Sequence, residues 1–360
     1  MTDRYRMAGE IQDNNKESNK EKFIFLRKFM EKYLTIAAEK TMQGMTVEKL
    51  LREYLGLTKK QISRAKFRPN GICKNNVQCR VTEKVSCGDE IKVCLETEET
   101  QSAQLISGEG AEAGLNILYE DEDVLAVNKP AGVLTHPSGV HYSDSLSNHV
   151  AAYFREKALS VCIRPVGRLD KETSGIVLFA KNQVAAQRLQ EQREKGILQK
   201  QYLALAEGTL SVDQATEWHT IEFPIRKVGG HPLRMEAVKD NGSLKVDSEI
   251  AGQDIEFTNC LRAVTHYQVR YSTEKWSVVS LKLDTGRTHQ IRVHMQVSGH
   301  PLLGDSLYGT SQAGKKQYPI YRAALHAGNM TFRQPFSQEV IVLDAPLPED
   351  FRHILGNITV

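Results

Sequence analysis

The sequence predicts an α+β protein with more than one domain. Its 360 residues exceed the roughly 250 to 300 residues at which a single hydrophobic core usually stops growing. From about residue 115 onward, strand-like and helical segments follow one another without the regular alternation of a parallel sheet. An acidic stretch rich in small residues separates this part from a shorter, more basic part. We therefore expect two folded parts joined by a linker.

Composition and charge place the chain among ordinary globular proteins. Because the net charge is only +3 and the pI is near 8.4, a nucleic-acid surface would have to come from local clusters of basic residues. The sequence contains neither a signal-peptide core nor a run of the roughly 18 apolar residues that a membrane helix needs. We expect a cytoplasmic protein that contacts no membrane.

Residues 1–46 are predicted to form an amino-terminal extension. Within it, the segment Phe23–Lys40 spaces its apolar residues as one face of a helix would. Residues 96–114 are acidic and show no periodicity, so they are predicted to be a solvated linker.

Residues 47–95 are predicted to form a small α/β domain. The pattern indicates two helices, the second capped by Thr58, followed by short strands that are interrupted at Pro69-Asn70-Gly71 and Gly88-Asp89. Basic residues crowd the second helix and the turn after it: Lys59, Lys60, Arg64, Lys66, Arg68, Lys74 and Arg80. Such a cluster suits a surface that follows phosphates, although a solvated helix face carries the same pattern.

Residues 115–360 are predicted to form the second domain, a mainly antiparallel mixed sheet flanked by helices and loops. Its strand-like segments are NILYEDEDVLAVNKP, GIVLFAKN, QYLALAEG, HYQVRYS and SVVSLKLDTG, and VAAQRLQEQREKG is predicted to be helical. In RPVGRLDKETSGIVLFAKN, Asp170 lies in a loop at the mouth of a buried strand, where catalytic side chains are often held. Taken alone, Arg168, Asp170 and Lys171 could equally form a surface ion-pair cluster.

Neither a metal site nor a nucleotide cofactor is expected. His289 and His294 do not have the HExxH spacing, and on a strand-like TGRTHQIRVHMQ they would face opposite sides. The six cysteines form no CxxC pair, and the segments GHPLLGD and GEGAEAG lack the order of a phosphate-binding loop.

Four segments in a fixed order resemble the RluA-type family of RNA pseudouridine synthases. They are YEDEDVLAVNKPAGVLTHPS, GRLDKETSGIVLFAKN, KQYLALAEG and LDTGRTHQIRVHMQVSGHPLLGDSLYG, and RAALHA and LDAPLPED follow them. The resemblance spans about residues 115 to 350. It implies a pseudouridine synthase catalytic domain that isomerises uridines in structured RNA without a cofactor. Ribosomal RNA is the expected substrate, transfer RNA is the alternative, and the enzyme is expected to be a monomer.

The resemblance also implies roles for individual residues. Asp170 matches the family's essential aspartate, Tyr202 matches the tyrosine of its KxYxA segment, and Arg292 in HQIR is expected to form an ion pair with Asp170. Arg287 and His289, both in TGRTH, are assigned to substrate binding.

Two further residues are assigned to substrate binding by the same resemblance. Arg168 matches the arginine beside the essential aspartate and is expected to fill the gap left by a flipped base. His136 falls in the family's KPAGxxxHP loop near the pocket. Extrusion of the uridine from its stack is required because a stacked base cannot reach such a pocket.

The chemistry agrees with these roles. Uridine becomes pseudouridine when the bond from ring nitrogen 1 to the sugar breaks, the base rotates and carbon 5 joins the sugar. A carboxylate can attack the sugar or the base, or it can remove a sugar proton so that a glycal forms, and the sequence leaves these routes open. Both require an ionised aspartate, which a neighbouring arginine would favour.

The small domain resembles the S-four-like RNA-binding module found in many of these synthases, which makes Lys59, Lys60 and Arg64 candidates for RNA binding. The long extension and an apparent insertion, Val246–Ala263, depart from the usual family plan. Two rivals remain open: a noncatalytic RNA-binding or ribosome-assembly factor, and a glycosidase that cleaves free nucleosides.

Overall fold

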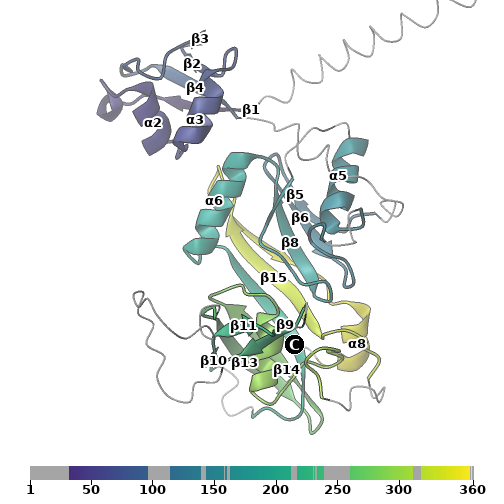
Figure 1. The fold of residues 1–360 in the computed structure, drawn as a ribbon. Helices are drawn as coiled ribbons and strands as arrows, with labels where there is room; N and C mark the ends of the chain where they lie inside the picture. The colour runs from purple at the N-terminus through teal and green to yellow at the C-terminus, as the bar shows by residue number, and fades with distance from the viewer. Residues whose placement is uncertain are drawn as a thin grey trace, which may run out of the picture. The chain divides into compact units, whose positions relative to one another are not determined.

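The computed structural model describes two compact units, a small one mainly before residue 96 and a large one from residue 114 onward (Figure 1). The described residues are 32–95, 114–138, 143–157, 159, 163–211, 217–229, 231, 233–238, 260–310, 318–356 and 358. The predicted linker up to residue 113 and the predicted insertion up to residue 259 lie outside them. No helix among the described residues is long and apolar enough to cross a membrane.

The small unit combines two helices with a four-stranded antiparallel sheet. The helices are α2 (Val47–Glu53) and α3 (Lys59–Lys66), after a short 3-10 turn, η1 (Lys40–Met42). The sheet has the order β1 (Lys32–Ala37), β4 (Glu90–Leu95), β2 (Ile72–Lys74), β3 (Val77–Gln78). Thr58 caps α3 as predicted: its Oγ1 accepts a hydrogen bond from Gln61 N at 3.2 Å, and its own N–H donates to Gln61 Oε1.

The helix predicted over Phe23–Lys40 is wrong for the residues that the structure describes. Lys32–Ala37 form β1, and all six residues pair with β4. Exposure alternates along the strand, with Leu34 and Ile36 less exposed than Tyr33. Pairing and burial against the small sheet have overridden the helical spacing. The small domain therefore extends further toward the amino terminus than residue 47.

The large unit is built on a ten-stranded mixed sheet, which confirms the predicted α+β class. Its main order is β10-β13-β14-β9-β15-β8-β6-β5, with β16 paired to β15 and β7 paired to β8. All of these pairs are antiparallel except the parallel pair β15 and β8. The strands are β5 (Ile117–Glu120), β6 (Val124–Lys129), β7 (Arg164–Val166), β8 (Ser174–Ala180), β9 (Gln199–Glu207), β10 (His219–Glu222), β13 (Val264–Ser272), β14 (Trp276–Leu283), β15 (Leu325–Arg333) and β16 (Val340–Asp344).

Helices cover different parts of this sheet. They are α5 (Leu146–Glu156), α6 (Gln183–Glu194), α7 (Gln290–Val297) and α8 (Glu349–Leu355), and a separate hairpin joins β11 (Ile225–Lys227) to β12 (Met235–Ala237). Leu189 of α6 packs with Leu178 and Phe332 over β8 and β15, and Phe351 of α8 packs with Val278 of β14. Figure 1 shows α6 beside β8 and β15, and α8 near one end of β15.

The strand-like interpretation of TGRTHQIRVHMQ is wrong, because Gln290–Val297 form α7. Apolar and polar residues alternate here, which is typical of a half-buried strand. Three of the polar residues are nevertheless buried, and only Gln296 of α7 is exposed. Gln290 donates to Val264 O, Arg292 pairs with Asp305, and His294 bonds Thr265. The alternation of apolar and polar residues therefore did not predict which residues are exposed, because Gln290, Arg292 and His294 each have a polar partner in the interior.

Candidate active site

Asp170 lies in the loop between β7 and β8, and its neighbours on both sides are tethered. Leu169 bonds Thr135 twice, with its N–H donating to Thr135 Oγ1 at 3.1 Å and its carbonyl accepting from the same hydroxyl at 2.9 Å. The carbonyl of Lys171 accepts from Lys129 Nζ at 3.2 Å. The Asp170 side chain is 17% exposed, so the carboxylate is fixed in position yet open to a ligand.

Lys129 is fully buried at the end of β6 and ties two loops together. Its ammonium donates to the carbonyls of Pro130 at 2.9 Å and Val133 at 2.8 Å, in addition to Lys171. Burial lowers the pKa of Lys129 to about 7, and the negative charge of Asp170 opposes this shift. Lys129 therefore holds the Asp170 loop through its hydrogen bond to Lys171 O, and it lies within electrostatic range of the Asp170 carboxylate.

Tyr202 is buried on β9, where it is the register partner of Leu281 on β14. Burial raises the pKa of Tyr202, and the negative charge of Asp170 raises it further. The phenol therefore keeps its proton at neutral pH and lies within electrostatic range of Asp170.

Arg292 is buried in α7 and pairs with two carboxylates other than Asp170. Its Nε and Nη2 each donate to Asp305 at 2.7 Å, and Nη2 lies 3.3 Å from Glu172 Oε2. The predicted ion pair between Arg292 and Asp170 is wrong, since no salt bridge joins these two described residues. A guanidinium that is only 2% exposed needs close counterions, and Asp305 supplies a bidentate one.

Arg292 nevertheless contributes to the field around Asp170. Burial opposes its charge, but the hydrogen bonds and charge of Asp305 outweigh that cost, and together with the charges of Glu172 and Asp170 they raise the pKa of Arg292. Arg292 is therefore a fixed positive charge beside Asp170 rather than its direct partner.

His289 completes the same group of residues. It adopts a left-handed backbone conformation, with φ of 55°, immediately before α7, and its Nδ1 lies 2.9 Å from the hydroxyl of Tyr308. Burial lowers the pKa of His289, whereas the charge of Asp170 raises it. The field of Asp170 thus reaches His289 and Tyr308 as well as Tyr202 and Arg292.

Arg168 and His136 lie on the solvent side of this group. Arg168 Nη2 is 3.9 Å from Asp170 Oδ1, and the Arg168 side chain is 62% exposed. Partial burial and the positive charge of Arg168 both lower the pKa of His136, whose Nδ1 lies 3.4 Å from Ser147 Oγ. The loop of His136 and the loop of Asp170 therefore meet at Arg168.

Arg287 is placed differently from its predicted neighbours. Its side chain is exposed, and its Nε donates to the carbonyl of Arg262 at 3.1 Å. Its backbone N–H donates to Gln290 Oε1 and so contributes to the start of α7. These contacts do not bring Arg287 to Asp170.

The two histidines weighed as metal ligands have separate partners. His294 uses both ring nitrogens, with Nδ1 at 2.8 Å from Thr265 Oγ1 and Nε2 at 3.0 Å from Phe223 O. Among the described residues, no three His, Cys, Asp or Glu side chains are grouped so that they could hold a metal ion.

Comparison with known proteins identifies the family. The RNA pseudouridylate synthase model matches residues 123–297, which contain Asp170, Tyr202 and Arg292. The RNA pseudouridine synthase YhcT of Bacillus subtilis is 38% identical over 272 residues, covering 75% of this chain and 79% of that protein. This chain belongs to the RNA pseudouridine synthase family.

Two further relatives agree with this assignment. The ribosomal large subunit pseudouridine synthase D of Neisseria meningitidis is 32% identical over 298 residues, covering 81% of this chain and 72% of that protein. The solved structure of human RNA pseudouridylate synthase domain containing 4 is 25% identical, with a TM-score of 0.50, over 67% of this chain and 91% of its own. The synthase is an isomerase that converts uridine in RNA to pseudouridine, as its RluA-type motifs predicted.

Sequence reasoning missed four residues of the synthase that surround Asp170: Lys129, Glu172, Asp305 and Tyr308. All four stand inside the segments that carried the family resemblance, namely NKPAG, GRLDKE and GDSLYG. Their position inside these segments was the available signal.

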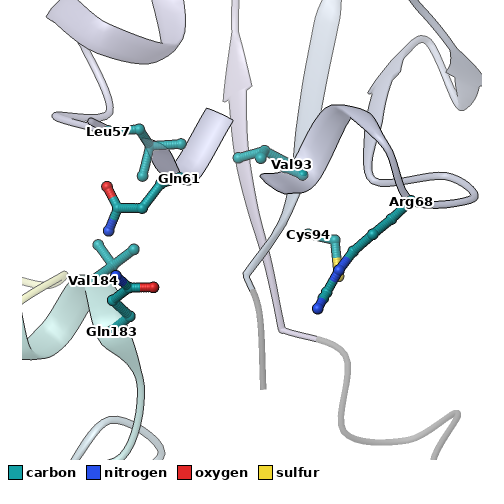
Figure 2. Close-up of a pocket in the computed structure, with 8 residues that line it drawn as sticks. Leu57, Gln61, Arg68, Val93, Cys94, Gln183 and Val184 are labelled. Carbon is teal, nitrogen blue, oxygen red and sulfur yellow. The ribbon is translucent and has the colours of Figure 1, made fainter. Parts of the chain in front are cut away.

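The small unit presents its basic residues on α3. Ile62 and Ala65 are buried, whereas Lys59 and Lys60 are exposed. Figure 2 shows Gln61 on α3 and Val93 on β4, two side chains of this unit. An amphipathic helix thus packs one face inward and leaves its cations toward solvent.

Proposed function

We propose that Asp170 is the carboxylate that initiates the isomerisation. The observation that carries this proposal is the field around it: Asp170 is partly open to solvent, and its charge acts on Tyr202, Arg292 and His289. Perturbed groups that converge on one accessible carboxylate are typical of a catalytic centre. Because Arg292 is already paired with Asp305, no buried arginine among the described residues occupies the Asp170 oxygens.

The proposed bond changes to the sugar and the base start from this carboxylate. Asp170 either attacks the sugar or the base, or removes a sugar proton to form a glycal. In each route the bond between ring nitrogen 1 and the sugar breaks, the base turns, and carbon 5 bonds to the sugar. Any bond formed to Asp170 breaks again, and in the glycal route the removed proton returns to the sugar. The proton on carbon 5 then leaves, and ring nitrogen 1 ends protonated, so that atoms and electrons balance without an oxidant. Both routes need the carboxylate of Asp170 in its ionised form.

Tyr202 and Arg168 have distinct proposed roles. Tyr202 stacks on the uracil, and its hydroxyl relays the carbon 5 proton, accepting it while passing its own proton onward, because the phenol stays protonated. Arg168 is exposed and close to Asp170, so it can fill the space that the extruded nucleotide leaves in the RNA stack. His136, beside Arg168, would then border the same nucleotide.

We further propose that the substrate is ribosomal RNA of the large subunit. Four relatives are named ribosomal large subunit pseudouridine synthase D. They are 31% to 34% identical to this chain, and the alignments cover 72% to 81% of their length. The small unit resembles an S-four-like module, and we assign RNA binding to its exposed Lys59 and Lys60 together with Arg64. Phosphate contacts of this kind supply affinity without base readout.

A complementation experiment tests both proposals. Pseudouridines are mapped across ribosomal and transfer RNA in cells that lack the gene, and then after return of the wild type or of Asp170→Asn. Asn keeps the size of the side chain and removes its charge, so we expect large-subunit sites to return with the wild type alone. Sites restored by Asp170→Asn would refute the role of Asp170. Sites lost only from transfer RNA would refute the proposed substrate.

A further inference from the structure

We propose that Arg193 and Lys200 form a binding site for an RNA phosphate at the edge of the catalytic pocket. Arg193 lies outside the segments that carry the family resemblance, whereas Lys200 is the lysine of the KxYxA segment that contains Tyr202. Neither contacts the Asp170 loop through a hydrogen bond among those described. This inference rests on the proposed placement of the catalytic pocket at Asp170 and Tyr202.

The guanidinium of Arg193 reaches from the last turn of α6 to two loops of the site. A Cβ added to Gly286 would lie 2.8 Å from Arg193 Nη2, and one added to Gly167 would lie 3.7 Å from Nη1. Gly167 directly precedes Arg168, and Gly286 directly precedes Arg287. The absence of side chains at these two glycines leaves the guanidinium room between the two loops.

Lys200 brings a second positive charge to the same place. It precedes Tyr202 by two residues on β9, so the two side chains leave the strand on the same face. Burial and, to a smaller extent, the nearby charge of Arg193 together lower the pKa of Lys200 to about 8. Burial and Asp170 raise the pKa of Tyr202, whereas Arg193 lowers it, so Arg193 lies near both residues.

These two cations have no acidic partner. Across the residues that the structure describes, neither Arg193 nor Lys200 forms a salt bridge with a carboxylate. Lys200 is half-buried and Arg193 is exposed, and two like charges this near repel each other until an anion joins them. The arrangement therefore favours a ligand with negative charge between a guanidinium fork and an ammonium group.

A phosphodiester of the RNA strand fits this requirement. Every nucleotide that enters the pocket brings its own backbone phosphates to the edge of that pocket. A guanidinium binds a phosphate through two parallel hydrogen bonds, and a lysine binds it as a point charge. The site would hold the phosphate of the extruded uridine, or of a directly adjacent nucleotide, and so set how far the base enters toward Asp170.

The experiment measures binding without turnover. In the Asp170→Asn background, Arg193→Gln, Lys200→Gln and Arg193→Lys are each titrated with fluorescent decauridine at salt concentrations from about 50 to 200 mM. For a single strand, each lost phosphate contact reduces the slope of log affinity against log salt by about 0.7. We expect that loss for both Gln variants and a retained slope for Arg193→Lys, which keeps the charge.

Lys275→Gln is the matched control. Lys275 is an exposed cation in the turn before β14, and its neighbour Trp276 is five residues along that strand from Leu281, the partner of Tyr202. At about 3.3 Å per residue, this places the control cation roughly 16 Å or more from Tyr202. Its removal changes net charge equally but should leave the slope within error of the parent.

The outcomes separate this inference from the proposed function. Unchanged slopes for both Gln variants, or equal losses in the Lys275 control, would overturn the phosphate site while leaving isomerisation untouched. Failure of the parent enzyme with Asp170 intact to form pseudouridine in any mapped RNA would instead overturn the proposed function. A loss of thermal stability in Arg193→Gln with an unchanged slope would identify a structural clamp on the two glycine loops.

Discussion

Both carboxylate oxygens of Asp305 accept hydrogen bonds from Arg292 at 2.7 Å, and neither side chain is more than 2% exposed. This pair neutralises the only buried arginine beside Asp170 among the described residues. Asp305 also accepts from the backbone N–H groups of Leu307 and Tyr308 at 3.0 Å, which fixes its orientation. Asp170 therefore keeps its own oxygens available for the substrate.

The first prediction concerns this buried pair. Asp305→Asn leaves the Arg292 guanidinium in place but removes its bidentate counterion. Removal of one partner of a buried ion pair costs about 3–5 kcal/mol, because the remaining charge stays buried without compensation. We expect the free energy of unfolding, measured with urea, to fall by that amount, and isomerisation to slow.

Asp284→Asn is the control for this prediction. Asp284 pairs with His266 at 3.0 Å, but its side chain is 57% exposed. An exposed pair contributes only about 0–1 kcal/mol. Equal losses of unfolding free energy in the two variants would show that the pair of Arg292 and Asp305 contributes no more than an exposed ion pair.

The second prediction separates the two proposed roles of Tyr202. Tyr202→Phe keeps the stacking ring and removes the hydroxyl, so single-turnover isomerisation should slow by about 10²- to 10⁴-fold while RNA affinity is retained. Tyr202→Leu also removes the stacking ring, and it should weaken RNA binding as well. A Phe variant with the wild-type rate would eliminate the proton relay and leave stacking alone.

The third prediction is a pH dependence that arises from His326. This histidine is buried on β15, with Nδ1 at 2.9 Å from Ser174 Oγ. Burial lowers its pKa from 6.5 to about 4, so between these values the unfolded chain binds a proton that the folded protein does not. The stability from neutral His326 is complete above pH 6.5 and is lost as the pH falls toward 4. By about pH 5 the loss amounts to roughly 2 kcal/mol.

Urea unfolding at pH 7 and pH 5 measures this contribution. In His326→Gln the difference between the free energies of unfolding at pH 7 and pH 5 should shrink by about 2 kcal/mol, whatever the absolute stability of the variant. The exposed His219 provides the control variant, His219→Gln, which should behave like the wild type. An unchanged pH difference in His326→Gln would show that another group titrates in this range.

The fourth prediction concerns RNA binding by the small unit. Replacing Lys59, Lys60 and Arg64 with Ala should weaken RNA affinity and flatten its salt dependence, because fewer counterions are released on binding. Filter binding of ribosomal RNA fragments at several salt concentrations measures both effects. The rate of the chemical step at saturating RNA should not change.

A second variant of the same unit controls for net charge. Lys40, Arg52 and Lys84 are exposed but lie outside α3, so their replacement with Ala removes three charges elsewhere. If the slope of log RNA affinity against log salt concentration falls equally in both triple variants, Lys59, Lys60 and Arg64 have no special role in RNA binding.

The sequence by itself determined the class of the fold, the Thr58 cap and the catalytic family. It also determined part of the large sheet, namely β5, β6, β8, β9, β13 and β14. These features depend on local patterns and on the identity of residues within motifs, and both can be read from the amino-acid sequence. Asp170, Tyr202 and His289 were found in this way, and the structure brings them together.

Only the tertiary structure decided which charges pair and which polar residues are buried. The partner of Arg292 proved to be Asp305, thirteen residues away, because α7 and the following loop fold against each other. Apolar spacing in Lys32–Ala37 and alternation in Gln290–Val297 were each compatible with the wrong element. Burial depends on neighbours distant in the sequence, so the competition between a helix and a strand, or between two counterions, is settled by packing.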